Sequence, residues 1–248
     1  MALGSETYSK VPRPVVPGDR IPLNIEATSG VTPTKVRVGP GLHQEGGELV
    51  AVKAGLLHHG AGNRWWVDNT QKRYVPAVGD SVLGTIAARH GESFSVDIGS
   101  AHRAILPILA FEGATKRNRP NLEVGTLIYA RVNVANKDMD PELECIDLKT
   151  GRAGGYGEIK KGYVVRCSLR TARMLLDSKN PIFASLAGAF SFETAVGLNG
   201  RVWINAGKPA QIIAASRVIQ AADGAAASDI ERKVAQELRN FANSMDTS

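Results

Sequence analysis

The feature that most constrains the fold is a strict alternation of apolar and polar residues in the segment 93–98, SFSVDI. Successive side chains of a β-strand point to opposite faces, so this segment predicts a strand with one core face and one solvent face. Four further short apolar segments surround it, at residues 81–87, 102–109, 127–134 and 143–148. Short strands spaced so closely are typical of a closed antiparallel barrel of the OB type. We assign residues 74–150 to this five-stranded barrel.

The chain before the barrel divides into two parts. Residues 1–33 are rich in Pro, Gly, Ser and Thr and have no apolar period, which predicts a flexible segment that is poorly ordered unless a partner holds it. Residues 34–73 alternate short apolar runs with glycine-rich breaks, so we expect a small β domain there.

The chain after the barrel predicts a second folded domain, of the α/β class, at residues 151–248. The segment 151–157, GRAGGYG, has four glycines in seven positions and is interpreted as the linker where this domain begins. Strands are expected at 162–169 and on both sides of Asn199-Gly200. The whole chain is therefore predicted to be mainly β, with an α+β part at its C-terminal end.

Helices complete the predicted α/β domain. The segment 169–178 is expected to be a helix with Met174, Leu175 and Leu176 facing inward, and two helices are expected after the last strand. Ser228 and Glu231 are spaced as a capping box at the start of the final helix. Four apolar residues recur behind it at helical spacing and form one stripe, Ile230, Val234, Leu238 and Phe241.

Composition limits the classes of protein to which the chain can belong. No apolar run approaches the roughly 20 residues that span a bilayer, and the first residues lack the apolar core of a signal peptide, so we expect a soluble intracellular protein without a membrane partner. A net charge of +6, from 30 Lys and Arg against 24 Asp and Glu, favours an anionic partner. Cys145 and Cys167 match no metal spacing and are expected to be buried thiols.

A GxxG motif occurs at residues 197–200, GLNG, in the predicted α/β domain. KH domains use such a loop to clamp RNA phosphates, but there the loop joins two helices. Here Leu198 and Asn199 are uncharged and a strand follows. Asn-Gly between two strands is the usual signal for a type I′ hairpin. We therefore favour a structural turn built by Gly197, Asn199 and Gly200 over an RNA clamp.

The segment 111–121, FEGATKRNRPN, places three cations in one loop, Lys116, Arg117 and Arg119. Three neighbouring cations can contact phosphates or an acidic protein surface. A merely solvated loop is the alternative. On the strand that follows, Tyr129 and Arg131 share one face. An exposed aromatic beside an arginine suits base stacking, whereas packing of Tyr129 against the neighbouring domain is an equal alternative.

The acidic residues at 138–147 raise the possibility of enzyme chemistry. Asp138, Asp140, Glu142, Glu144 and Asp147 are spaced as potential ligands of a nuclease metal, because alternate residues of a strand project on one face. The segment KDMDPELE nevertheless has the composition of a solvated loop, and no other cluster completes a site. We therefore expect no catalytic residue, no metal site and no cofactor.

Five segments in this order resemble the cap subunits of the RNA exosome: GPGL (39–42), WVDNTQKRYVP (66–76), FEGATKRNRPN (111–121), ANKDMDPE (135–142) and GLNGRVW (197–203). Those proteins consist of an N-terminal β domain, an S1 domain, which is an OB barrel, and a KH domain. The resemblance implies that the GxNG loop serves domain packing and that the chain is not an enzyme. It covers residues 35–241.

The resemblance also implies partners and a location. It implies a noncatalytic subunit that sits on a ring of RNase PH-like proteins beside other cap subunits and guides single-stranded RNA to an associated exoribonuclease, in rRNA processing and RNA decay. It implies a place in the nucleus, the nucleolus and the cytoplasm. The rival hypotheses are a metal-dependent ribonuclease that uses residues 138–144 and a freestanding RNA-binding regulator.

Overall fold

A computed structural model describes residues 12–22, 36–60, 62–69, 71, 73–136, 138–148, 150–177, 180–225 and 229–246. The chain divides into two compact units, residues 1–70 and residues 71–248, and each is described by itself. None of the helices in the described residues is both long enough and apolar enough to cross a membrane.

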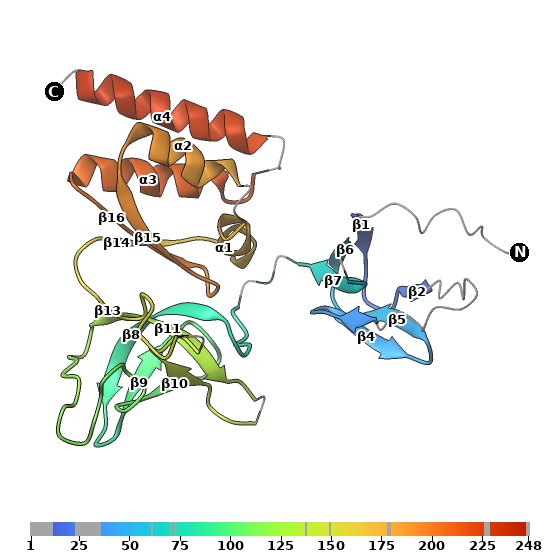
Figure 1. Cartoon of the computed structure of the whole chain (residues 1–248). Coiled ribbons are helices and arrows are strands. Elements are labelled where there is room, and N and C mark those ends of the chain that lie inside the picture. Colours follow the sequence, from blue (N-terminus) through green and yellow to red (C-terminus); the bar gives the residue numbers. More distant parts are fainter. Residues whose placement is uncertain are drawn as a thin grey trace, which may run out of the picture. The chain divides into compact units, whose positions relative to one another are not determined.

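The first unit consists of two small sheets, in which all strand pairs except one are antiparallel. One has the strand order β1-β6-β7-β3 and the other has the order β2-β5-β4 (Figure 1). Their bounds are β1 (Arg13–Val15), β2 (Arg20–Pro22), β3 (Arg37–Val38), β4 (Leu42–Glu45), β5 (Glu48–Ala51), β6 (Gly55–Gly60) and β7 (Arg64–Asp68). Leu49, Leu57 and Val67 are among the buried residues of their common core.

The expectation that the first 33 residues are poorly ordered is wrong for residues 12–22. Strand β1 pairs with β6 and strand β2 pairs with β5, and each contributes one buried side chain, Val15 and Ile21. Strands of three residues, each containing a proline, carry too little periodicity to be recognised in the sequence. The remainder of the segment lies outside the described residues.

The second unit begins with the predicted five-stranded barrel, which the structure confirms, except that one pair of its strands, residues 104–107 with residues 142–144, is parallel and not antiparallel. Its five strands are β8 (Ser81–Arg89), β9 (Ser93–Asp97), β10 (Ala104–Pro107), β11 (Leu127–Val134) and β12 (Glu142–Glu144). They follow the order β12-β10-β9-β8-β11, and an additional pairing of β12 with β11 closes the barrel. Phe94, Val96 and Ile98 are fully buried, as the alternation in this segment predicts.

The glycine-rich segment 151–157 connects the barrel to the rest of the unit through β13 (Gly157–Ile159). This strand pairs with β11 and therefore extends the barrel sheet. The segment before it is held by contacts to the barrel: the Ala153 N–H donates to the Glu112 carboxylate at 2.6 Å, and Tyr156 packs against the barrel core.

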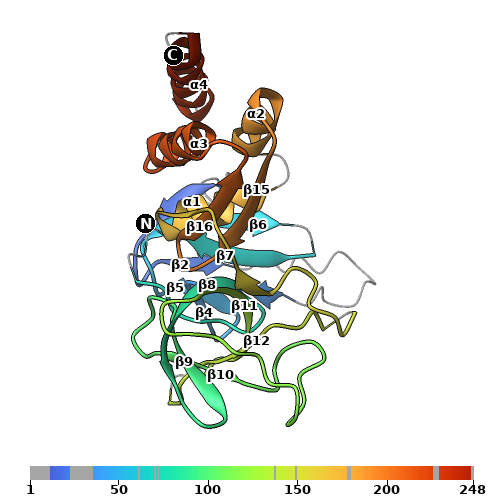
Figure 2. The same cartoon turned by 90° about the vertical axis from the view of Figure 1, so that its left-hand side faces the viewer.

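The C-terminal part is the predicted α/β domain, a three-stranded sheet of order β14-β16-β15 with helices layered against it (Figures 1 and 2). Its elements are β14 (Tyr163–Arg166), α1 (Leu169–Leu175), α2 (Pro181–Ala189), β15 (Phe192–Gly197), β16 (Arg201–Ala206), α3 (Pro209–Ala222) and α4 (Ile230–Asp246). Val165, Val202 and Ile204 face the helices in one apolar core.

The helices differ from the prediction in two respects. Helix α2 was not expected, although its start carries a signal: the Asn180 side chain accepts from the Ile182 N–H, and Pro181 occupies the first turn. Helix α1 ends at Leu175, so Leu176 is half exposed instead of inward.

The final helix follows the predicted stripe. Ile230 and Val234 are buried, and Leu238 and Phe241 pack against the same core. The predicted capping box involves Ser228, which lies outside the described residues.

Candidate nucleic-acid interface

The GLNG motif forms the turn between β15 and β16. The strands pair from Phe192 with Ala206 to Gly197 with Arg201, which leaves a three-residue loop. Gly200 has φ = 76°, while Asn199 is not in the positive-φ region. The predicted hairpin is confirmed, but its predicted type I′ turn is wrong, because that turn needs positive φ at both central residues. A three-residue loop with glycine in the left-handed position replaces it.

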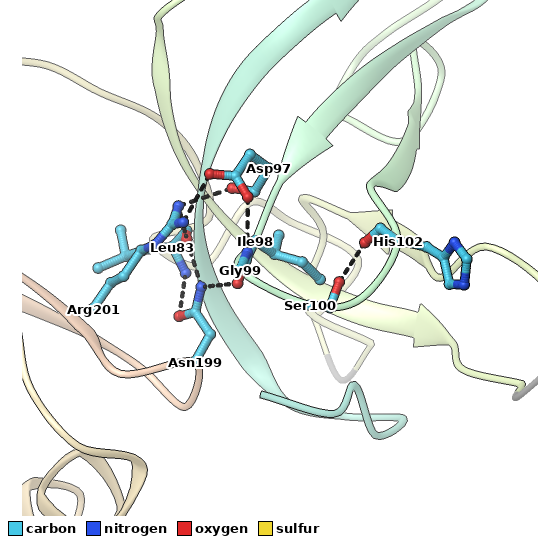
Figure 3. A network of polar contacts seen from close by, with 8 residues as sticks. All are labelled: Leu83, Asp97, Ile98, Gly99, Ser100, His102, Asn199 and Arg201. Carbon is cyan, nitrogen blue, oxygen red and sulfur yellow. Dashed lines mark hydrogen bonds and ion pairs between the residues drawn. The ribbon is translucent and has the colours of Figure 1, made fainter. Parts of the chain in front are cut away.

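Asn199 ties this turn to the barrel. Its Oδ1 accepts from the Leu83 N–H at 3.2 Å, and its Nδ2 donates to the carbonyls of Leu83 and Ile98 at 2.7 and 2.9 Å (Figure 3). The side chain is buried, with 8% of the residue exposed. Both the oxygen and the nitrogen of the amide group are therefore hydrogen-bonded to the barrel backbone. The motif serves domain packing, as the resemblance implies, and its asparagine is not available to a phosphate.

Arg201 adds a charged contact beside Asn199. Its guanidinium donates to the Asp97 carbonyl and to the Asp97 carboxylate, both at 2.8 Å (Figure 3). Burial alone would raise the pKa of the Asp97 carboxyl. Hydrogen bonds from Arg201 and from the Gly99 N–H, together with the positive charge of Arg201, outweigh burial and hold that pKa below its ordinary value.

Tyr129 belongs to the same domain contact. Its hydroxyl donates to the Val196 carbonyl at 3.2 Å, and its ring stacks on Tyr156 with centroids 5.1 Å apart. Leu169 and Leu198 of the α/β part pack against the barrel core nearby. Of the two roles considered for Tyr129, the structure places it in domain packing, because its hydroxyl and one ring face are already used.

Arg131 is not an exposed cation. It lies opposite Glu144 in the β11–β12 pairing and forms an ion pair with that carboxylate. Only 14% of its side chain is exposed. The structure thus assigns Arg131 to the fold of the barrel and corrects the expectation that it faces RNA.

The basic loop between β10 and β11 is exposed and internally ordered. Lys116, Arg117 and Arg119 all lie at the surface. The Thr115 N–H donates to the Asn118 carbonyl, and the Asn118 N–H donates to the Thr115 hydroxyl, both at 2.9 Å. Within the described residues, the Lys116 ammonium and the Arg117 guanidinium have no hydrogen-bond or ion-pair partner. This loop is therefore the predicted site that keeps free positive charge.

The acidic residues of 138–147 are not gathered into a site. Glu144 is paired with Arg131, and Asp140 lies 4.0 Å from the His102 ring. Across the part of the chain that the structure describes, no group of three or more His, Cys, Asp or Glu side chains is placed to hold a metal ion. The alternation that suggested a ligand set does not bring these carboxylates together.

Three segments of the chain match known protein families. Residues 36–73 match the family described as exosome complex exonuclease Rrp40 N-terminal domain. Residues 74–157 match exosome complex component RRP40, S1 domain, and residues 162–210 match a KH domain. The predicted boundaries after residues 33, 73 and 150 stay predictions.

Relatives extend the similarity over most of the chain. Exosome complex component rrp40 of Schizosaccharomyces pombe is 48% identical over 194 residues, which cover 76% of this chain and 79% of that protein. Exosome complex component RRP40 of Drosophila melanogaster is 40% identical over 227 residues, or 92% and 96% of the two chains. A crystal structure provisionally described as an exosome complex RNA-binding protein shares the fold, with a TM-score of 0.59, 23% identity and coverage of 69% and 98%.

Proposed function

We propose a function from one premise: the chain belongs to the RRP40 family of exosome complex components. On this proposal it is a noncatalytic, RNA-binding cap subunit. It stabilises a ring of RNase PH-like subunits beside other cap subunits, and it guides single-stranded RNA into the channel for 3′-to-5′ degradation by an associated exoribonuclease. We propose the nucleus, the nucleolus and the cytoplasm as its locations.

The observation that carries the RNA-binding part is the ordered basic loop on the barrel. Lys116 and Arg117 are exposed and unpaired within the described residues, and hydrogen bonds of the loop backbone fix the chain between Thr115 and Asn118. Phosphates of a single strand are attracted to such a surface, and each contact releases counterions. The GLNG turn is a weaker candidate for RNA binding, because the polar side chain of Asn199 joins the α/β domain to the barrel.

The test removes the charge of the loop. In the full chain, Lys116→Ala, Arg117→Ala and Arg119→Ala are combined, and affinity for labelled single-stranded RNA is measured at several salt concentrations. Each lost phosphate contact should flatten the dependence of log affinity on log salt by about 0.7. Thermal stability should hardly change, since exposed substitutions usually alter it by within about 0.5 kcal/mol.

A matched control removes the same charge elsewhere, with Ala at the exposed Arg217, Arg232 and Arg239 of helices α3 and α4. If the salt slope falls by the same amount in both triple variants, RNA binding depends only on the net charge of the chain and not on the loop. Assembly with the ring subunits is measured in parallel. A loop variant with unchanged salt slope and unchanged assembly would overturn the assignment of the loop as a contact surface.

A further inference from the structure

The basic loop is held against a neighbouring turn of the barrel by one of its own cations. Arg119 Nη1 donates to the Gly91 carbonyl at 3.2 Å, in the turn between β8 and β9. Arg119 Nε donates to the Lys116 carbonyl at 3.1 Å, within its own loop. One planar guanidinium therefore bridges two segments that lie more than twenty residues apart in the sequence.

The turn that accepts this bridge is itself anchored. The His90 N–H donates to the Ser93 carbonyl at 2.8 Å and closes the β8–β9 turn. The Ile108 N–H donates to the Glu92 carbonyl at 3.0 Å and joins that turn to the end of β10. The Gly91 carbonyl therefore belongs to a turn whose position is fixed by hydrogen bonds on both sides.

A second hydrogen bond connects the end of β8 to the C-terminal end of the basic loop. Arg89 Nη1, at the end of β8, donates to Asn121 Oδ1 at 2.8 Å. The bond from Arg89 reaches the chain beyond Pro120, whereas the Nε bond of Arg119 reaches the backbone of Lys116 itself. The bonds between Thr115 and Asn118 order the loop internally, and Arg119 is the side chain that ties the backbone of Lys116 to the β8–β9 turn.

We propose that Arg119 is a positioning residue for single-stranded RNA, and that it orders the loop so that Lys116 and Arg117 meet the phosphates. This rests on the proposed function and deepens it, because it separates three cations that the sequence presents as equivalent. Two of the three guanidinium nitrogens of Arg119 are used within the barrel, whereas the charges of Lys116 and Arg117 are left for a ligand. Preorganised charge binds more tightly because less freedom is lost on binding.

The substitution Arg119→Lys separates positioning from charge. Lysine keeps the positive charge but carries its donors on one nitrogen, so it cannot reproduce the fork that reaches two carbonyls. We expect Arg119→Lys and Arg119→Ala to weaken RNA binding by the same factor, about three- to tenfold. The exposed Arg103 provides the control, with Arg103→Lys and Arg103→Ala measured in the same assay. Full affinity in Arg119→Lys would mean that Arg119 acts through its charge.

A double-mutant cycle tests the same point by additivity. If Arg119 acts through Lys116 and Arg117, then Arg119→Ala should cost almost nothing in the background Lys116→Ala, Arg117→Ala. If the remaining nitrogen of Arg119 contacts a phosphate directly, the losses should add, and the proposal is overturned.

Amide hydrogen exchange gives a readout that needs no RNA. Exchange at residues 113–119 should rise in both Arg119 variants, while exchange in the barrel strands stays unchanged. Unchanged exchange in this loop overturns the bridge, even if RNA binding to the wild-type chain is intact. If the wild-type chain binds no single-stranded RNA at all, the proposed function fails and the positioning role fails with it, whatever the exchange shows.

Discussion

Asn199 satisfies three backbone groups of the barrel with a single side chain. In Asn199→Ala, the Leu83 N–H and the Ile98 carbonyl would lose this partner in a buried place, whereas the Leu83 carbonyl keeps a bond from Arg201 Nη1 at 3.4 Å. A buried polar group left unpaired costs about 1–3 kcal/mol. Because some of these groups can recruit water, we expect the free energy of unfolding to fall by about 3 kcal/mol in total, measured by urea denaturation of the full chain.

Asn205→Ala is the matched control for this measurement. Asn205 lies on the same hairpin, and its amide donates to Glu193 at an exposed position, so its loss should cost less than about 0.5 kcal/mol. One outcome would instead favour the role of the GLNG loop as an RNA clamp. In that case Asn199→Ala would unfold like the wild-type chain and would bind RNA more weakly.

The β15–β16 hairpin depends on glycine for two separate reasons at Gly200. Its φ of 76° strains any other residue, and a Cβ there would lie 2.6 Å from the Cys167 carbonyl oxygen. Gly224 has a similar φ of 73° but has open space around it. We expect Gly224→Ala to cost about 1 kcal/mol from strain. Gly200→Ala should cost at least about 1 kcal/mol more, because the overlap forces a backbone shift. Equal losses in thermal unfolding would show that the tight contact with Cys167 is unimportant.

Elements with a full period could be predicted from the sequence, and short ones could not. Strand β9 follows from its alternation, and helix α4 follows from the stripe that begins at Ile230. Strands β1 and β2 are three residues long, so their place depends on pairing with distant strands. Helix α2 is almost wholly apolar and lacks a polar face, which leaves the Asn180-Pro181 start as its only local signal.

In the candidate site, too, features set by local sequence could be predicted, whereas features set by distant residues could not. The exposed loop with Lys116 and Arg117 could be predicted, because a segment so poor in apolar residues cannot enter a core. The burial of Arg131 could not, since it depends on Glu144 in a neighbouring strand. The contact of Arg201 with Asp97 joins residues 104 positions apart, and local patterns carry no information at that separation.

Several of the described acidic residues serve as structural partners in separate parts of the chain. Glu144 neutralises Arg131 inside the barrel, Asp97 holds Arg201 at the domain contact, and Glu112 accepts from the Ala153 N–H. A metal-dependent nuclease needs several carboxylates that converge on one ion. Carboxylates committed to partners in separate places do not supply such a site.

We therefore predict that the purified full chain neither hydrolyses nor phosphorolyses RNA. Labelled single-stranded RNA is incubated with the chain and magnesium, manganese or inorganic phosphate, and product length is followed on a gel. The sharpest rival is a site around Asp138 and Asp140, so Asp138→Asn and Asp140→Asn are assayed beside the wild-type chain. A contaminating nuclease would act equally in all three preparations and would decline on repurification. Turnover that survives repurification and disappears in either variant would contradict the noncatalytic assignment, because only chemistry at those carboxylates would depend on their charge.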